Sequence, residues 1–298
     1  MSRSTDVVNK TKGPVVPVNI CFNEDTSVDF GAIHNYVDSL ITNGIPVILL
    51  TSGSSEYKWL STTDVWRITE VIAEANAGRA LFIAASGSWD IRTCTSYLKH
   101  ADEVGADAVK IQPHPTLALD RDLYLGYFDR IRTGSDIPLF LLDPPLTLAI
   151  EMASDERIVG AKVHGYAEYY KMTRATRDLN FATICAGQMG SMVFGHQLGS
   201  PAYLCTIAPF LPSIALEFFK KLDTGQYEDA LKFVAKYEEP WLETATDVGW
   251  LHAIKEAIHL VGLYPNNRLA PPQKATTPEQ TKQVRDTLKR TFGSILFE

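Results

Sequence analysis

The sequence predicts an α/β protein that folds as a (β/α)8 TIM barrel with additional C-terminal helices. Short apolar runs alternate with longer segments of helical periodicity, and eight such pairs follow one another along the 298 residues. Each run is continuously apolar rather than alternating, which is typical of parallel strands covered by helices. A barrel of this kind usually takes about 250 residues, so the chain has room for an extension.

The predicted strands are short runs rich in Val, Ile, Leu and Ala. They span residues 14–20, 46–50, 80–85, 108–112, 138–142, 158–163, 182–186 and 202–207. The helical segments that follow them span residues 28–43, 62–77, 90–104, 120–133, 146–155, 167–178, 189–198 and 210–222. Two doubly wound domains are the alternative fold. That fold needs a glycine-rich phosphate turn after its first strand, and the segment CFNEDTS at 21–27 contains no glycine.

Three further helices are expected after the eighth unit, over residues 226–244, 248–261 and 278–292. This region is too short and too interrupted by loops to build its own core easily, so we expect it to pack on the barrel. We therefore expect three parts. Residues 1–12 are a disordered or loosely attached N-terminus, residues 13–225 form a (β/α)8 barrel, and residues 226–298 form a C-terminal helical extension.

Charge and cysteine content limit the partners and the compartment of this protein. Its 28 basic and 35 acidic residues give a net charge of −7, which argues against binding nucleic acid or an anionic membrane. Four well-separated cysteines form no CxxC or Cys/His pattern, so we expect free thiols in a reducing compartment. The N-terminus lacks an apolar signal stretch, and glycines and prolines interrupt the uncharged segment 181–216. We expect a cytoplasmic protein without a nucleic-acid or membrane partner.

Barrel enzymes place their reactive groups at the carboxyl ends of the strands and in the loops that follow. The polar residues at these positions are Asn19, Thr51, Ser52, Ser54, Ser55, Glu56, Ser86, His114, Asp143, Lys162, His164, Gln188, Tyr203 and Thr206. No HExxH, P-loop or GxSxG motif is present. A metal-dependent aldolase that uses His114, Asp143 and His164 is one alternative, although we expect no metal.

Lys162 is the most informative candidate, because it lies within a predicted buried strand. An ammonium group loses its hydration there, and desolvation favours the neutral amine by lowering its pKa. A neutral amine at the mouth of a barrel can attack a ketone and form a Schiff base, which withdraws electrons from neighbouring bonds. Lys110 lies similarly on the fourth strand, and the residue pattern does not separate the two. A strand-end lysine that only reaches solvent is the alternative interpretation.

His164 follows Lys162 by two residues, so the two side chains lie on the same side of the strand. Because imidazole groups titrate near neutrality, His164 is a candidate for acid–base chemistry. Asp143 and His114, at neighbouring strand ends, are further candidates, and Tyr203 is a candidate hydroxyl. The alternatives are a loop histidine that only forms hydrogen bonds and an aspartate that caps the next helix.

Five segments resemble, in consistent order, the motifs of the dihydrodipicolinate synthase / N-acetylneuraminate lyase family of class I aldolases and lyases. They are VPVNICFNEDTSVDF, NGIPVILLTSGSSEYKWLS, IPLFLLDPP, IVGAKVHG and ICAGQM. The resemblance covers roughly residues 13–290. It implies a TIM barrel, an imine on Lys162 without any cofactor, and a homo-oligomer, either a dimer or a tetramer.

The resemblance also implies where the substrate carboxylate binds. The family's hydroxyl pair falls on Ser54 and Ser55, and the placement of the gap allows Ser52 to compete. Glu56 falls on the family's glutamate, which helps to fix this loop, and Gly187 in ICAGQM falls on a glycine expected in the substrate-binding segment. Hydroxyl and backbone N–H groups hold a carboxylate through charge-assisted hydrogen bonds.

Three positions depart from the family pattern. The tyrosine that relays a proton falls on Leu142, the second aromatic residue falls on His114, and the arginine that binds the second substrate of the synthase falls on Thr147. Leucine cannot transfer a proton, so these departures argue against dihydrodipicolinate synthase and sialic-acid lyase activity. The Ser-Glu pair at 55–56 and the Leu-Asp-Pro-Pro sequence at 142–145 are more similar to the 2-keto-3-deoxy-sugar-acid dehydratase branch.

The predicted function is a Schiff-base-forming (class I) lyase acting on a small 2-oxo acid. The enzyme would either dehydrate a 2-keto-3-deoxy sugar acid or cleave or form a carbon–carbon bond with pyruvate, because both reactions pass through the same imine. The alternatives are a non-catalytic barrel that binds a metabolite and a condensation of the dihydrodipicolinate synthase type.

Overall fold

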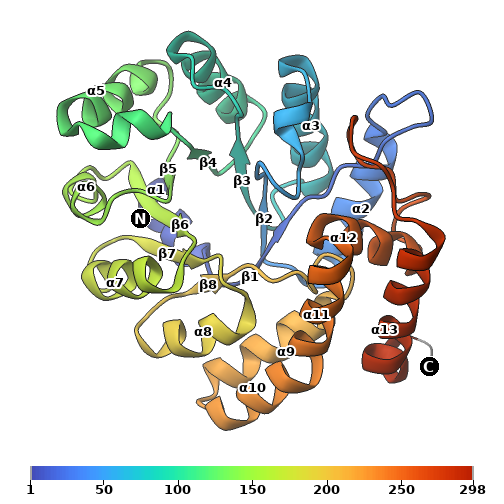
Figure 1. Cartoon of the computed structure of the whole chain (residues 1–298). Coiled ribbons are helices and arrows are strands. Elements are labelled where there is room, and N and C mark those ends of the chain that lie inside the picture. The colour runs from blue at the N-terminus through green and yellow to red at the C-terminus, as the bar shows by residue number, and fades with distance from the viewer. Residues whose placement is uncertain (1, 297–298) are drawn as a thin grey trace.

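Eight parallel strands close into a barrel in the computed structural model, which describes residues 2–296 (Figure 1). Each strand pairs with the next one along the chain, and the last returns to pair with the first. The strands are β1 (Gly13–Pro17), β2 (Val47–Leu49), β3 (Leu81–Ala85), β4 (Ala108–Ile111), β5 (Leu139–Leu142), β6 (Ile158–Val163), β7 (Ala182–Cys185) and β8 (Ala202–Tyr203). The predicted (β/α)8 barrel is confirmed.

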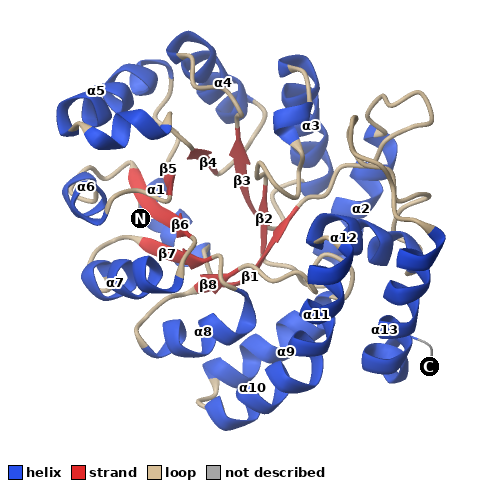
Figure 2. Cartoon of the chain, in the orientation of Figure 1, coloured by secondary structure: helices blue, strands red, loops and turns tan. Residues whose placement is uncertain are grey.

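Helices cover the outside of the barrel (Figure 2). They are α2 (Phe30–Thr42), α3 (Thr62–Asn76), α4 (Ile91–Glu103), α5 (Arg121–Ile131), α6 (Leu146–Met152), α7 (Tyr166–Thr176), α8 (Gln188–Gln197) and α9 (Pro212–Asp223). Asp29, Asp90 and Asp120 each accept a hydrogen bond from the amide three residues later, and Ser61 forms a capping box with Asp64. These side chains satisfy amides that the first helical turn leaves unpaired, so they fix where the helices begin.

Alternate residues of each strand face the barrel interior, as the two-residue period of a strand requires. The interior is filled by Val15, Val47, Leu49, Leu81, Ile83, Ala108, Phe140, Val159, Ala182, Ile184, Ala202 and Leu204. A second and larger apolar cluster lies between the strands and the surrounding helices. The side chain of Tyr203, which lies between two interior-facing residues, belongs to this outer cluster.

The first residues form helix α1 (Arg3–Lys10), whereas we expected residues 1–12 to be disordered or loosely attached. Val7 of this helix is 1% exposed and packs into the interior cluster, so the helix covers one end of the barrel. Nη1 of Arg3 lies 2.7 Å from Oδ1 of Asp102. An eight-residue helix is too short to be stable by itself, and its tertiary contacts stabilise it here.

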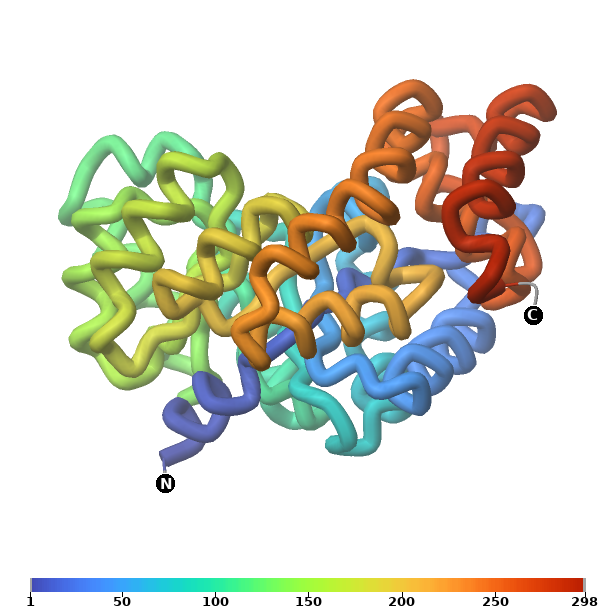
Figure 3. Tube along the Cα trace, turned by 90° about the horizontal axis from the view of Figure 1, so that it is seen from below, coloured from blue at the N-terminus to red at the C-terminus, as the bar shows by residue number. Residues whose placement is uncertain are grey.

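The C-terminal region is helical and packs on the barrel helices and on itself. Its elements are α10 (Tyr227–Phe233), a π-helical segment (Val234–Glu238), α11 (Glu239–Val248), α12 (Trp250–Leu260) and α13 (Pro278–Leu296). The first helical stretch thus runs beyond its predicted end, and Gly249, with a φ of +97°, separates α11 from α12. Figure 3 shows α12 and α13 at the upper right of the view and α1 at the lower left. The division of the chain into a barrel and a distinct extension over residues 226–298 stays a prediction.

None of the helices within residues 2–296 is both long and apolar enough to cross a membrane.

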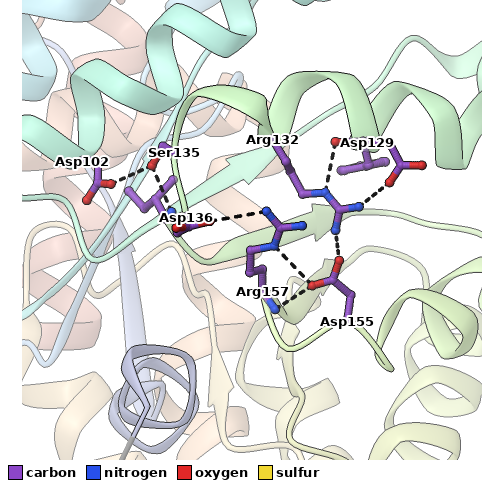
Figure 4. A network of polar contacts seen from close by, with 9 residues as sticks. Asp102, Asp129, Arg132, Ser135, Asp136, Asp155 and Arg157 are labelled. Carbon is purple, nitrogen blue, oxygen red and sulfur yellow. Dashed lines mark hydrogen bonds and ion pairs between the residues drawn. The ribbon is translucent and has the colours of Figure 1, made fainter.

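A network of charged side chains joins two loops of the barrel (Figure 4). Arg132, which follows α5, contacts both Asp129 and Asp155. Asp155 also lies 3.4 Å from Nε of Arg157, which precedes β6. These loops lie at the amino ends of the strands, opposite the end at which barrel enzymes carry out chemistry, so the network is structural.

Candidate active site

A cavity of about 410 Å³ lies at the carboxyl ends of the strands. The barrel contributes to its lining Pro17, Thr51, Leu142, Lys162, Ala186 and Leu204. Helices α11 and α12 contribute Leu242, Ala245, Thr246, Trp250 and Ile254. The strand ends and the C-terminal helices thus form the cavity together, at the position where TIM-barrel enzymes carry out chemistry.

A second cavity, of about 460 Å³, lies between the loops that follow β2 and β3. Tyr57, Trp66 and Trp89 are among its lining residues. Neither Lys162 nor Lys110 lines it, so we place the candidate active site in the first cavity.

Lys162, His164 and Asp143 form a hydrogen-bonded chain at the first cavity. Nζ of Lys162 lies 2.8 Å from Nε2 of His164, and Nδ1 of His164 lies 2.7 Å from Oδ2 of Asp143. The amide of His164 donates to Oδ1 of Asp143 over 2.7 Å. Because a carboxylate only accepts hydrogen bonds, Nδ1 carries the imidazole proton and Nε2 accepts from the lysine amine. The structure therefore brings together three of the four predicted catalytic residues.

Asp143 owes its position to an unusual backbone conformation. Its φ of +44° lies in the left-handed region, which aspartate tolerates better than most residues. Asp143 directly follows the last residue of β5, and this backbone conformation lets its carboxylate reach His164, which directly follows β6. Burial favours the protonated acid, but the hydrogen bonds from the ring and amide of His164 outweigh it and lower the pKa of Asp143. The carboxylate is therefore ionised beside the imidazole.

Lys162 and Lys110 are both buried, but only Lys162 lines the cavity. Burial, together with the positive charge of Lys110, lowers the pKa of Lys162 to about 7 against the opposing effect of Asp143. Burial likewise lowers the pKa of Lys110 to about 8. Nζ of Lys110 donates to the hydroxyl of Tyr57 over 3.4 Å. The geometry thus separates two lysines that the residue pattern left equivalent.

The loop that follows β2 places two of its three predicted serines at the cavity. Ser52 and Ser54 line it beside Thr51. Oγ of Ser55 instead accepts a hydrogen bond from the amide of Thr51 over 3.1 Å, and the residue is 1% exposed. Ser55 therefore helps to hold the shape of the loop, and the binding of substrate by its hydroxyl stays a prediction.

Glu56 fixes this loop to the C-terminal helices. Its φ is +50°, and its Oε1 lies 2.7 Å from Nζ of Lys255 on α12, with both side chains buried. Oε2 of Glu56 accepts a hydrogen bond from the amide of Ala270 over 2.8 Å. Burial lowers the pKa of Lys255, and Glu56 opposes that effect. The ion pair joins the serine loop to the helices that form the outer wall of the cavity.

The loop that follows β7 presents Gln188 to the cavity rather than the predicted Gly187. Gln188 has a φ of +70°, and its Oε1 accepts a hydrogen bond from the amide of Thr206 over 2.9 Å. The Thr206 hydroxyl accepts from the indole N–H of Trp241 over 2.9 Å. Glu238 accepts hydrogen bonds of 2.7 and 2.8 Å from two amides in the first turn of α8. These contacts hold Gln188, and the prediction of Gly187 as a contact residue is corrected.

Two more predicted residues, Tyr203 and His114, lie away from the cavity. Tyr203 faces the surrounding helices, and its hydroxyl donates to the carbonyl of Ala215 over 2.7 Å. The ring of His114 packs edge-on against Trp89 at 4.5 Å between centroids, and its Nδ1 lies 2.7 Å from Oγ1 of Thr116. Tyr203 points outward because successive strand residues face opposite sides of the sheet. His114 is held away from the cavity because it caps the short 3-10 helix that follows it.

The metal alternative required His114, Asp143 and His164 to converge. His114 lies elsewhere, as its contacts with Trp89 and Thr116 show. Within residues 2–296, no group of three or more His, Cys, Asp or Glu side chains is arranged to hold a metal ion.

The cavity residues that the sequence analysis missed come from α11 and α12, above all Leu242, Ala245 and Trp250. The helical periodicity predicted these helices. It carried no signal for their place in the site, because apolar residues on a helix face look the same whether they cover a core or a cavity.

A family model described as the dihydrodipicolinate synthetase family matches residues 10–291 of this chain. The chain belongs to the dihydrodipicolinate synthetase family. The resemblance recognised from the five motifs is thereby confirmed. So is the prediction of a class I Schiff-base lyase, because the family consists of such enzymes.

Two curated relatives of this family member carry different activities in their names. A 4-hydroxy-tetrahydrodipicolinate synthase of Gluconacetobacter diazotrophicus is 26% identical over 231 residues, covering 74% of this chain and 77% of that protein. A probable 5-dehydro-4-deoxyglucarate dehydratase of Streptomyces avermitilis is 23% identical, covering 74% of this chain and 69% of that protein.

Solved structures of family members share the fold. YagE, a prophage protein of E. coli K12 crystallised in complex with pyruvate, matches with a TM-score of 0.85 at 20% identity, covering 94% of this chain and 98% of that chain. The N-acetylneuraminate lyase of Mycoplasma synoviae matches with a TM-score of 0.83 at 19% identity, covering 95% of this chain and 99% of that chain. At these identities the likeness supports the barrel and its C-terminal helices.

Proposed function

We propose that this lyase forms an imine between Lys162 and the C2 carbonyl of a small 2-oxo acid. The observation that carries the proposal is the buried amine of Lys162, which lines the cavity 2.8 Å from Nε2 of His164. With a pKa of about 7, roughly half of the Lys162 amines are neutral at pH 7, and only the neutral amine is a nucleophile. The imine on this lysine serves as the electron sink, so the proposal needs no cofactor.

His164 takes over the proton transfer for which the family uses a tyrosine and for which Leu142 is unsuited. Attack by the amine on C2 gives a carbinolamine, which must lose its hydroxyl as water. Nε2 of His164 can take the proton released from the amine and return it to the departing hydroxyl. The ionised carboxylate of Asp143, bound to Nδ1, stabilises the imidazolium that exists between these two transfers.

The serine loop supplies the site for the substrate carboxylate. Ser52 and Ser54 line the cavity beside Thr51, and their hydroxyls are suited to charge-assisted hydrogen bonds. The fixed position of this loop, held by the Glu56–Lys255 ion pair, lets it bind the carboxylate with little reorganisation.

The imine supports two reactions at the neighbouring carbons. In the first, the C3–C4 bond breaks, its electrons move toward the imine nitrogen to give an enamine, and an aldehyde leaves. In the second, a base removes a C3 proton to give an enamine that still carries C4, and this enamine expels the C4 hydroxyl, which takes a proton from an acid and leaves as water. We propose that the enzyme catalyses one of these, with pyruvate as the 2-oxo acid released in the first.

We further propose a homo-oligomer, a dimer or a tetramer, that acts in the cytoplasm on a free small molecule. Tyr166 on α7 and Phe194 on α8 are 56% and 51% exposed, and their ring centroids lie 6.4 Å apart. This exposed aromatic pair supports a contact surface there. The four buried free cysteines suit a reducing compartment, and the net charge of −7 does not suit a nucleic-acid or membrane partner.

Borohydride trapping tests the proposed imine. The full chain is incubated with pyruvate, 2-oxobutyrate or 2-keto-3-deoxy sugar acids, reduced, and analysed by intact mass and peptide mapping. We expect a single adduct on Lys162 that Lys162→Met abolishes and Lys110→Met preserves. An adduct on Lys110 would contradict the assignment of the lysine. No adduct with any acid would contradict the proposal and favour a metabolite-binding barrel without catalysis.

A further inference from the structure

The cavity around Lys162 is lined by both polar and apolar residues. Its polar groups include the amine, its imidazole partner and the serine loop. The apolar lining residues that we call the apolar wall are Leu142, Leu204, Leu242, Ala245, Trp250 and Ile254. A substrate whose carboxylate and ketone bind these polar groups would therefore extend its remaining carbons along the apolar wall.

His164 is the one basic side chain of the described cavity lining that is left for a second carboxylate once Lys162 has formed an imine. Among the described residues that line the cavity, the ionisable side chains are Lys162, His164 and Cys205. Nε2 and Nδ1 of His164 bind Lys162 and Asp143. Burial raises the pKa of Cys205 to about 12, so this thiol is neutral. A dicarboxylate would leave its distal charge without a partner, which an apolar wall disfavours.

Two hydrogen-bonding groups near the apolar wall already have partners within the protein. Oε1 of Gln188 accepts from the amide of Thr206, and the Thr206 hydroxyl accepts from the indole of Trp241. The side-chain NH2 group of Gln188 and the hydroxyl of Thr246, an exposed residue of α11, belong to residues that also line the cavity. A chain of several hydroxyl groups would therefore find few partners along the apolar wall when buried here.

Trp250 extends the apolar wall up to the serine loop. A Cβ built on Gly53 would lie 3.0 Å from Cη2 of the Trp250 ring, so the indole lies directly against this loop. The Trp250 residue is also 46% exposed, so part of its ring is available for a ligand to pack against. An aromatic ring at the mouth of the cavity favours apolar and especially aryl groups.

We infer that the substrate is a 4-hydroxy-2-oxo acid that carries an apolar aryl or alkyl group on C4. This inference rests on the proposed function. In the cleavage direction, the imine on Lys162 accepts the electrons of the C3–C4 bond, and His164 takes the proton of the C4 hydroxyl. The products of that step are an apolar aldehyde and an enamine. Protonation of the enamine at C3 and hydrolysis of the imine then release pyruvate, and the water lost in imine formation balances the water consumed.

The synthetic direction gives the direct test. The full chain is supplied with pyruvate and, separately, with benzaldehyde, hexanal, glyceraldehyde or succinic semialdehyde, and kcat/KM for product formation is measured by mass spectrometry. We expect kcat/KM for benzaldehyde and hexanal to exceed that for the other two by at least about tenfold, a common result of complementary apolar packing. Equal or better use of glyceraldehyde or succinic semialdehyde would overturn the inference.

Borohydride trapping with pyruvate, run in parallel, separates the two possible failures. No adduct on Lys162 would mean that the proposed function fails. An adduct on Lys162 together with a preference for polar aldehydes would leave the proposed function intact and reject only the apolar substrate.

A charge introduced on the apolar wall should change the preference. Leu242→Arg is expected to reduce kcat/KM for benzaldehyde at least about tenfold and to raise it for succinic semialdehyde, with pyruvate trapping preserved. Leu231→Arg, at a 47% exposed position on α10, is the matched control and should change neither value. If Leu242→Arg does not fold, Trp250→Ala is used in its place, with the same expected loss for benzaldehyde. An unchanged preference in the folded variant would contradict the inference.

Discussion

Lys162→Met should stabilise the folded protein near neutral pH while it abolishes imine formation. Lys162 has an ordinary pKa of 10.5 in the unfolded chain and about 7 in the fold, mainly because burial disfavours its charge. At 1.36 kcal/mol for each unit of pKa, the buried lysine costs the folded state about 5 kcal/mol at pH 7. Loss of its hydrogen bond to His164 costs the variant about 1 kcal/mol, which is the smaller effect.

The same shift sets the pH dependence. Between pH 7 and 10.5 the unfolded chain binds more protons than the folded one at this residue, so its contribution to stability rises with pH across that window. The advantage of the methionine variant should therefore be largest at and below pH 7 and fall to less than about 1 kcal/mol by pH 9.5, where the lost hydrogen bond offsets most of it.

Thermal unfolding of the wild type and Lys162→Met at pH 7 and pH 9.5 measures both quantities. About 4 kcal/mol at pH 7 corresponds to a rise in Tm of roughly 6 °C for a chain of 298 residues, from an unfolding entropy of about 2.1 cal/mol/K per residue. Lys171→Met, at an exposed position on α7, is the matched control and should leave Tm unchanged. A lower Tm for Lys162→Met at pH 7, or a difference that does not shrink by pH 9.5, would refute the desolvation argument.

Two further substitutions test how the site is held. Lys255→Met leaves Glu56 as a buried carboxylate without its ion pair and is expected to cost about 3–5 kcal/mol of stability in urea unfolding. Adding Glu56→Gln should recover much of that loss, and no loss in the single variant would contradict the prediction. Asp143→Asn removes the carboxylate that orients His164, so we expect turnover to fall by about 10²–10⁴-fold while pyruvate trapping persists. Because Asp143 raises the pKa of the reactive lysine, the trapping midpoint should also move to lower pH, and a shift to higher pH would disprove that.

The Lys162–His164–Asp143 chain offers a physical account of a lyase without the family's tyrosine. Leu142 stands where that tyrosine falls and lines the apolar side of the cavity. One replacement thus removes a proton donor and adds apolar surface at the same position. In the proposed mechanism, the imidazole of His164, which directly follows β6, takes the place of that proton donor, and the added apolar surface bears on substrate choice.

Residue periodicity was sufficient to predict the barrel because its signals are local. Each strand is a short apolar run and each helix repeats its apolar residues every three to four positions, so both are visible within about fifteen residues of sequence. The cluster of Lys162 and His164 was predictable for the same reason, since two residues of separation place both side chains on one side of a strand. Helix α1 was missed because Val7, its one buried residue in the apolar interior cluster, becomes significant only against the end of the barrel.

The sequence by itself determined the order of elements and the family, and it made Lys162 a candidate, because all of these depend on local patterns and motifs. The tertiary structure alone decided which polar groups meet in the cavity. Ser55 is turned into its loop, Tyr203 faces the helices, and His114 caps a short helix, although all three follow or end strands. Helices α11 and α12 enter the site from the far end of the chain. Side-chain direction and long-range packing depend on contacts between distant residues, and a local pattern cannot encode them.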